Sequence, residues 1–303
     1  MKRIATAVVL IPIVLLIVLR APIAALAAVV AVVAILTIRE LLDLTKAYGV
    51  EPLRWPTYIL ALLIFASIAA TADAPAMQEI SVLLGTGILC MFAPFVFATT
   101  AMARRDLRSS FPAAAASVFA LTAVALPLAL LVQIRNMWVG AVPGTVWILY
   151  LLAVVWAGDT CAMYVGKAIG RHKMSPRISP GKTWEGAIAS VIGGVAAGTL
   201  IYLKAYGIST GLAAYGLIEP TQVYRNLTRP AHVGTIVILS ALINIAAQLG
   251  DLVESLIKRG AGVKDSGSLL PGHGGMFDRI DALLFAVPVF WIYVVLHLVP
   301  LGD

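Results

Sequence analysis

The sequence has little charge for its length. Only 12% of its 303 residues are Asp, Glu, Lys or Arg, whereas a soluble domain carries about 25%. Hydrophobic residues make up 61% of the chain, and its mean hydropathy is +0.97. This balance excludes a soluble globular domain, a disordered chain and a collagen-like fibre, and it indicates a protein that lies in a lipid bilayer.

Cysteine is also scarce. Cys90 and Cys161 both stand in apolar stretches, which excludes a disulfide framework and a thiolate metal cage and predicts packing roles. In a soluble protein, the formal net charge of +7 would suggest a nucleic-acid partner. In a membrane protein such an excess reports topology and contact with anionic lipid. We therefore expect the bilayer, and no nucleic acid, as a partner.

Long apolar runs are abundant. A helix that crosses the hydrocarbon core needs about 20 mostly apolar residues, because its backbone polar groups must be bonded within the segment. We expect an all-α, polytopic membrane protein with about nine transmembrane helices. The first two runs are short and close together, so a tight hairpin or a partly re-entrant pair would make the count eight to ten. The runs are residues 4–19, 21–38, 56–72, 80–102, 111–133, 140–157, 186–203, 233–250 and 281–299.

The distribution of Lys and Arg predicts the orientation. These residues are retained on the cytoplasmic side of a membrane, and with nine spans 17 of the 22 fall in one alternating set of connections. We therefore expect a cytoplasmic N-terminus and an external C-terminus. The run at 4–19 resembles a signal peptide, but no small-residue cleavage site follows it, which predicts a retained first span. A bacterial inner membrane is the expected location.

Two segments concentrate the charge. Residues 158–186 and 251–281 hold 16 of the 37 charged residues and fall on the predicted cytoplasmic face. Both are rich in Gly, Pro and Ser, which predicts irregular backbone with accessible N–H groups. We expect one site built from these two loops, in a single membrane-embedded domain with residues 1–157 as scaffold and 158–303 as the catalytic half.

The acids of the second segment favour a metal site. Residues three apart share a helix face, so Asp251 with Glu254, and Asp278 with Asp281, could each direct two carboxylates the same way. Mg²⁺ accepts one or two carboxylates and completes its shell with water and phosphate oxygens. We predict Asp251 and Asp278 as its ligands, because apolar flanks make a charge costly there. The alternative is ion pairing with Lys258, Arg259 and Arg279, which for Glu254 and Asp265 remains equally open.

The first segment contains Gly181-Lys182-Thr183, which looks like the end of a P-loop. That motif requires a Gly at position 176, where Pro176 stands, so a P-loop NTPase is excluded. Ser179, Lys182 and Thr183 could bind a phosphate at the start of the next helix. Alternatively, Ser179 or Thr183 is a helix cap. His273 stands in a glycine-rich turn without a second His or Cys at metal spacing, which argues against zinc.

Residues 255–281 resemble the signature of the phosphatidate cytidylyltransferase family, also called CDP-diacylglycerol synthases. The block from Asp159 to Gly186, with its run SPGKTWEG, resembles the same family, but Gly181 stands where we expect a Lys. The resemblance implies transfer of CMP from CTP to phosphatidate, giving CDP-diacylglycerol and pyrophosphate, with Mg²⁺. The matched signature positions are Ser255, Lys258, Arg259, Lys264, Asp265, Gly267, His273, Gly274, Gly275, Asp278, Arg279 and Asp281.

The resemblance also implies roles for these residues. It agrees with Asp251 and Asp278 as metal ligands, and we expect Asp281 to support the ion or a basic residue. Lys258, Lys264 and Arg279 are expected to neutralise the triphosphate and the leaving pyrophosphate. The catalytic set predicted in this way is Asp251, Asp278, Lys258, Lys264 and Asp281, and the substrate-binding set is Ser179, Lys182, Thr183, Arg259, Asp265, His273 and Arg279.

Other functions remain as alternatives. A polyprenol kinase or an enzyme of archaeal ether lipids would share CTP and similar loops but use a different acceptor. A transporter would also contain buried charges and broken helices, but here the charges gather in loops on one face and no inverted repeat is found. The sequence leaves the oligomeric state open, with a homodimer as one alternative.

Overall fold

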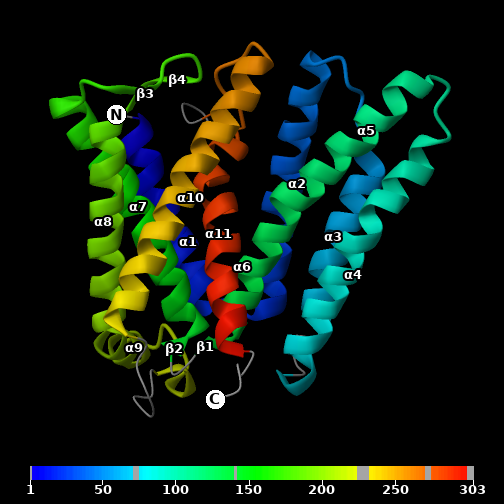
Figure 1. The fold of residues 1–303 in the computed structure, drawn as a ribbon. Helices are drawn as coiled ribbons and strands as arrows, with labels where there is room; N and C mark the ends of the chain where they lie inside the picture. The colour runs from blue at the N-terminus through cyan, green and yellow to red at the C-terminus, as the bar shows by residue number, and fades with distance from the viewer. Residues whose placement is uncertain (1, 71–74, 140–141, 224–231, 270–273, 299–303) are drawn as a thin grey trace. The chain divides into compact units, whose positions relative to one another are not determined.

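The computed structural model describes residues 2–70, 75–139, 142–223, 232–269 and 274–298. The chain is mainly α-helical in these ranges (Figure 1), which confirms the all-α class. Two short antiparallel hairpins interrupt the helices, β1–β2 and β3–β4. The hairpin strands are β1 (Trp138–Val139), β2 (Val142–Pro143), β3 (Lys173–Ser175) and β4 (Ser179–Thr183).

The helices follow the apolar runs of the sequence. Each of the nine predicted runs overlaps a helix, and a short helix, α9, was not predicted. A π-helical turn (Leu121–Ala125) joins α5 to α6, and a 3₁₀ turn lies at Pro220–Gln222. In chain order the helices are α1 (Lys2–Arg20), α2 (Ile23–Ala47), α3 (Arg54–Ala70), α4 (Pro75–Ala101), α5 (Leu107–Ala120), α6 (Leu126–Asn136), α7 (Gly144–Ile169), α8 (Trp184–Leu203), α9 (Ala205–Ala214), α10 (Val233–Gly260) and α11 (Phe277–Leu298).

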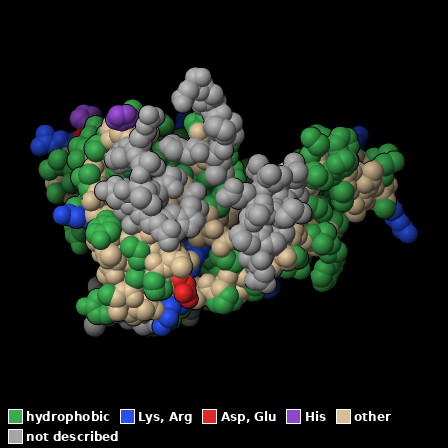
Figure 2. Space-filling model, turned by 90° about the horizontal axis from the view of Figure 1, so that it is seen from below, with side chains coloured by type: hydrophobic (Ala, Val, Ile, Leu, Met, Phe, Trp, Pro, Cys, Tyr) green, Lys and Arg blue, Asp and Glu red, His purple; other side chains and the backbone are tan. Residues whose placement is uncertain are grey.

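Six helical segments in the described ranges are long and apolar enough to cross a membrane. Three shorter apolar helices, Ile11–Arg20, Arg54–Ala70 and Thr86–Ala101, are of 10–17 residues. The predicted count of nine spans therefore stays a prediction. On the face seen in Figure 2, the described side chains are mostly hydrophobic or uncharged, with Lys and Arg at isolated positions. These features are those of an integral membrane protein.

Two predicted apolar runs end before the helices that contain them. The predicted run 140–157 belongs to α7, which continues to Ile169, and the run 233–250 belongs to α10, which continues to Gly260. Asp159 and Asp251 therefore lie within helices and not in irregular loops. Hydropathy indicates where a chain leaves apolar surroundings. The helical backbone hydrogen bonds can continue beyond that point, so the helix is longer than its apolar run.

The chain forms two compact units. The first comprises Met1–Val9, Ala21–Gln133 and Leu256–Ile280. In it α2 packs against α3, α3 against α4, and α4 against α5, around fully buried side chains that include Ile38 and Ile64. The division into a scaffold, residues 1–157, and a catalytic half, residues 158–303, stays a prediction.

The second unit comprises Leu10–Arg20, Ile134–Ser255 and Asp281–Asp303. Its most extensive helix contact joins α7 and α8. Four small residues at four-residue spacing form a buried stripe on α8, and small residues let helix backbones approach closely. A Cβ added at Gly194 would lie 3.0 Å from the Val154 carbonyl oxygen of α7, which shows how little room remains. The stripe is Gly186, Ser190, Gly194 and Gly198.

Buried polar contacts position α10 against α7 in the second unit. The Tyr150 hydroxyl lies 2.8 Å from Ser240 Oγ, and Asn244 Nδ2 donates to the Val154 carbonyl at 3.4 Å. Gln248 Nε2, one turn further along α10, donates to Asn244 Oδ1 at 2.8 Å and to the Ala187 carbonyl of α8 at 3.2 Å. Because an unsatisfied polar group is costly in an apolar interior, these contacts fix the end of α10 that carries Asp251.

Candidate functional site

A pocket of about 310 Å³ lies within the second unit. Helices α7, α8 and α10 and the β3–β4 hairpin contribute its lining. Asp159 comes from α7, Lys182 and Thr183 from β4, and Asp251 from α10. The pocket therefore joins residues from both charge-rich segments of the sequence.

The β3–β4 hairpin positions Lys182. Its strands pair Lys173 with Thr183 and Ser175 with Ser179. The half-buried Lys182 ammonium lies 2.8 Å from Asp251 Oδ2, and it donates to the Gln248 carbonyl at 3.4 Å. The Lys182 side chain is 23% exposed and the Asp251 side chain is 43% exposed. Solvent therefore screens this ion pair only in part.

Thr183 has the capping role that the sequence left open. Its hydroxyl accepts a hydrogen bond from Gly186 N at 3.2 Å, at the N-terminus of α8. The Thr183 side chain is also buried and contributes to the pocket lining. Ser179 lies at the opposite end of β4, where it pairs with Ser175 across the hairpin. Thr183 therefore both caps α8 and lines the pocket.

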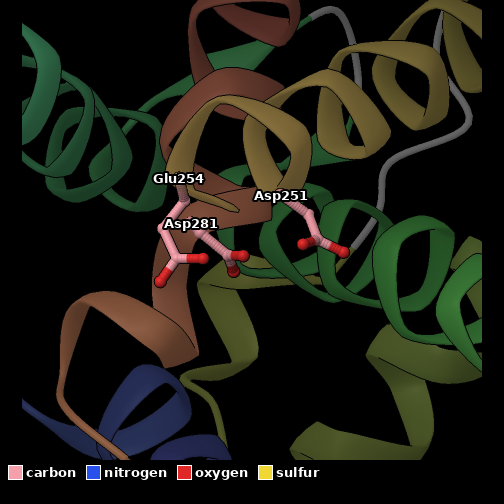
Figure 3. A group of neighbouring side chains, drawn as sticks. All are labelled: Asp251, Glu254 and Asp281. Carbon is pink, nitrogen blue, oxygen red and sulfur yellow. The ribbon is translucent and has the colours of Figure 1, made fainter. Parts of the chain in front are cut away.

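Three carboxylates gather beside this pocket. Asp251 and Glu254 project from α10 and Asp281 from α11, with the Glu254 and Asp281 carboxylates next to each other (Figure 3). One oxygen from each residue lies within 4.8 Å of the others. Glu254 is only 2% exposed, and Ser255 Oγ lies 3.4 Å from Asp251 Oδ1. This acidic cluster could bind a metal ion, because hard divalent cations prefer oxygen ligands.

Asp278 has a different set of contacts, within the first unit. Its Oδ1 forms an ion pair with Lys258, whose side chain is 12% exposed against 6% for Asp278. Its Oδ2 accepts hydrogen bonds from Ser266 N at 2.9 Å and from Gly275 N at 2.7 Å. Together these donors stabilise the ionised form of a carboxylate that is almost removed from water.

Glu40 of α2 belongs to the same surroundings and is not among the site residues that the sequence predicts. Its carboxylate accepts hydrogen bonds from Met276 N and Phe277 N, each at 2.9 Å. Glu40 lies outside both charge-rich segments and more than 200 residues before its partners. The only sequence signal was a carboxylate shortly after the apolar run 21–38.

The other predicted site residues lie on the surface or outside the described ranges. Arg259, Lys264, Asp265 and Arg279 are exposed. Arg259 Nη1 donates to the Val263 carbonyl at 3.3 Å. The predicted role of His273 falls on a residue outside the described ranges.

The sequence profile described as the Cytidylyltransferase family matches residues 1–297. The chain belongs to this cytidylyltransferase family. The match runs through the β3–β4 hairpin, the acidic cluster and the surroundings of Asp278. Membership thus covers the two charge-rich segments and the apolar helices that carry them.

Several curated bacterial proteins resemble this cytidylyltransferase-family chain. The phosphatidate cytidylyltransferase of Brucella suis is 40% identical over 146 residues, which are 48% of this chain and 46% of the relative. The Haemophilus influenzae enzyme of the same name is 41% identical over 143 residues, 47% of this chain and 43% of the relative. That of Bacillus subtilis is 34% identical over 153 residues, 50% and 49%. The matched stretch thus spans about half the length of these relatives.

Proposed function

We propose that this chain transfers CMP from CTP to phosphatidate, forming CDP-diacylglycerol and pyrophosphate. The observation that carries the proposal is the ion pair between Lys182 and Asp251. It joins a cation from the SPGKTWEG run to the first acid of the cluster Asp251, Glu254 and Asp281. Phosphoryl-type transfer uses carboxylates and cationic side chains together. The carboxylates hold a metal ion, and Lys and Arg neutralise the phosphate oxygens.

The acidic cluster fits Mg²⁺ as the cofactor. Asp251, Glu254 and Asp281 offer only oxygen ligands, and their ligand atoms are within 4.8 Å of one another, which suits a hard cation. A bound ion would neutralise phosphate charge and polarise the phosphoryl group. The assignment of Asp278 as a second ligand beside Asp251 stays a prediction, because in this structure its oxygens contact Lys258, Ser266 and Gly275.

Positioning and charge neutralisation account for the reaction. The phosphate oxygen of the lipid is already a nucleophile, so it attacks the α-phosphorus of CTP without a strong general base. The bond between the α- and β-phosphates breaks and pyrophosphate leaves. We assign the orientation of a substrate phosphate to Ser179, Lys182 and Thr183, and the neutralisation of developing charge to Lys258, Lys264 and Arg279. Arg259, Asp265 and His273 remain proposed substrate contacts.

A panel of acceptors tests the substrate. Purified protein in detergent is incubated with labelled CTP, Mg²⁺ and either phosphatidate, a polyprenol or an unsaturated archaeal ether lipid. The proposal expects labelled product with phosphatidate. Product with a polyprenol or an ether lipid alone would assign the chain to a sister reaction.

The pocket predicts an effect of restoring the family's expected lysine. Gly181 lines the pocket, and a Cβ added there would meet nothing within 4 Å. Gly181→Lys should therefore fold normally and add a cation beside the substrate phosphates. We expect the KM for CTP or phosphatidate to fall about two- to fivefold at low salt, and the gain to shrink at about 1 M salt because of screening. Gly181→Gln is the uncharged control, and an equal gain from it would contradict an electrostatic cause.

We further propose nine spans in a bacterial inner membrane, with the N-terminus and both charge-rich segments in the cytoplasm. The support is the distribution of Lys and Arg, 17 of 22 in one set of connections. In a background without Cys90 and Cys161, an impermeant maleimide applied to intact cells should label Tyr215→Cys and spare Arg105→Cys. Both wild-type side chains are exposed. Labelling of Arg105→Cys alone would reverse the orientation.

A further inference from the structure

Glu40 holds the N-terminus of a helix that lies far away in the sequence. Helix α11 begins at Phe277, and the first N–H groups of a helix have no partner within it. A nearby Ser, Thr, Asp or Asn usually accepts such bonds. Here Glu40 does so from α2, since Oε1 accepts from Met276 N and Oε2 from Phe277 N, each at 2.9 Å.

Two signature glycines leave room for the Glu40 carboxylate. A Cβ at Gly267 would lie 2.7 Å from Glu40 Oε1, and its three nearest neighbours would all be Glu40 atoms. A Cβ at Gly275 would clash with Glu40 Oε2 and with Ser266 Oγ. Neither glycine has a positive φ, so space for the Glu40 side chain, and not backbone conformation, explains glycine at these positions.

The segments that contact Glu40 also contact Asp278. Ser266 Oγ lies 2.9 Å from Glu40 Oε2 and 2.9 Å from Asp278 Oδ2. A hydroxyl has one proton, so it donates to one carboxylate at a time. Ser266 N and Gly275 N donate to Asp278 Oδ2. The residues that fix Asp278 are therefore next to, or identical with, those that Glu40 fixes.

We propose that Glu40 is a positioning residue, which holds Ser266 and residues 275–277 so that Asp278 and its partner Lys258 keep the arrangement needed for turnover. All of these residues belong to the first unit. The part of this inference that concerns turnover rests on the proposed cytidylyl transfer. The part that concerns the contacts of Glu40 does not.

The first test compares two carboxylates of α2. Glu40→Gln keeps the size of the side chain but replaces an acceptor oxygen by an NH₂ group that faces backbone donors. Asp43 is the matched control, because its Oδ1 instead contacts Arg54 in the same unit. We expect Glu40→Gln to lower kcat by about 10- to 100-fold with less than about a threefold change in KM for CTP. Asp43→Asn should keep wild-type kinetics.

The second test measures amide hydrogen exchange without metal or substrate. In Glu40→Gln, the amides of Met276 and Phe277 should exchange at least about tenfold faster than in wild type, because one of the two acceptor oxygens is replaced by an NH₂ group that repels the backbone donors and the carboxylate charge is lost. Exchange in α7 and α8 should be unchanged. Unchanged exchange at Met276 and Phe277 in Glu40→Gln would overturn the proposal.

The third test is a double-variant cycle. Gly267→Ala should displace the Glu40 carboxylate and reduce kcat, whereas in a Glu40→Ala background the added methyl group meets no carboxylate. The double variant should therefore be no slower than Glu40→Ala alone. If the two substitutions instead reduced kcat independently, so that their fold-losses multiplied in the double variant, the proposal would be overturned. This comparison does not depend on Glu40→Gln and stays informative if that variant folds poorly.

The outcomes separate the inference from the proposed function. Accelerated exchange in Glu40→Gln, together with wild-type protein that forms no CDP-lipid, would reject cytidylyl transfer and retain the contacts of Glu40. Normal kcat in Glu40→Gln, with active wild-type protein, would reject the positioning role and retain cytidylyl transfer.

Discussion

Asp251→Asn should reduce the rate of CDP-lipid formation by about 10²- to 10³-fold. The substitution removes the negative charge that faces Lys182 at 2.8 Å and takes one ligand from the acidic cluster. Loss of one preorganised charge at a site of phosphoryl transfer costs about this much. The Asp251 side chain is 43% exposed, so the fold should tolerate the change. The measurement is the initial rate at saturating CTP and phosphatidate over a range of Mg²⁺ concentrations.

Two variants control this result. Asp251→Glu keeps the charge on a longer side chain and should retain more activity than Asp251→Asn. Asp43→Asn removes a carboxylate that contacts Arg54 instead and should remain fully active. Wild-type turnover by Asp251→Asn at every Mg²⁺ concentration would remove Asp251 from the site.

Of the single substitutions proposed, Lys258→Met should lower the free energy of unfolding most. It leaves the Asp278 carboxylate, 6% exposed, without its ionic partner, and breaking a buried pair costs about 3–5 kcal/mol. The N–H donors Ser266 N and Gly275 N still stabilise the charge, so we expect the lower end of this range. Thermal unfolding of the detergent-purified protein measures the change.

Removing the second charge should recover part of that loss. Asn has nearly the shape of Asp, so Asp278→Asn in combination with Lys258→Met removes both charges of this ion pair with little change of shape. The double variant should therefore be more stable than the sum of the two single effects predicts, while all three variants lose turnover. Additive destabilisation would show that the pair does not act as a unit. Turnover by the folded double variant would remove both residues from the catalytic set.

The sequence predicted the helices well because apolar runs report burial in lipid. It did not predict how far α7 and α10 continue, because charged residues such as Asp159 and Lys258 are compatible with a helix that has left apolar surroundings. The β3–β4 hairpin was also missed. Its strands are only three and five residues long, too short for an alternating pattern to be recognised.

The candidate site was partly predictable. The position of the charges and the family resemblance both predicted Lys182, Asp251 and Asp278 as site residues. The structure brings Lys182 and Asp251 together, and the roles of the three residues stay predictions. The contact between Lys182 and Asp251 and that between Glu40 and Phe277 join residues that are far apart in the chain. A single sequence contains no local pattern for such pairs. These pairs form only when the fold brings the distant segments together.

The most direct measurement follows two labels of CTP in the purified, detergent-solubilised protein with phosphatidate and Mg²⁺. Cytidylyl transfer predicts that the α-³²P label enters the organic phase, that the γ-³²P label leaves as pyrophosphate, and that a chelator stops both. Entry of the γ label into the lipid would instead identify a kinase. The absence of both labels from the lipid, with folded protein, would contradict the account.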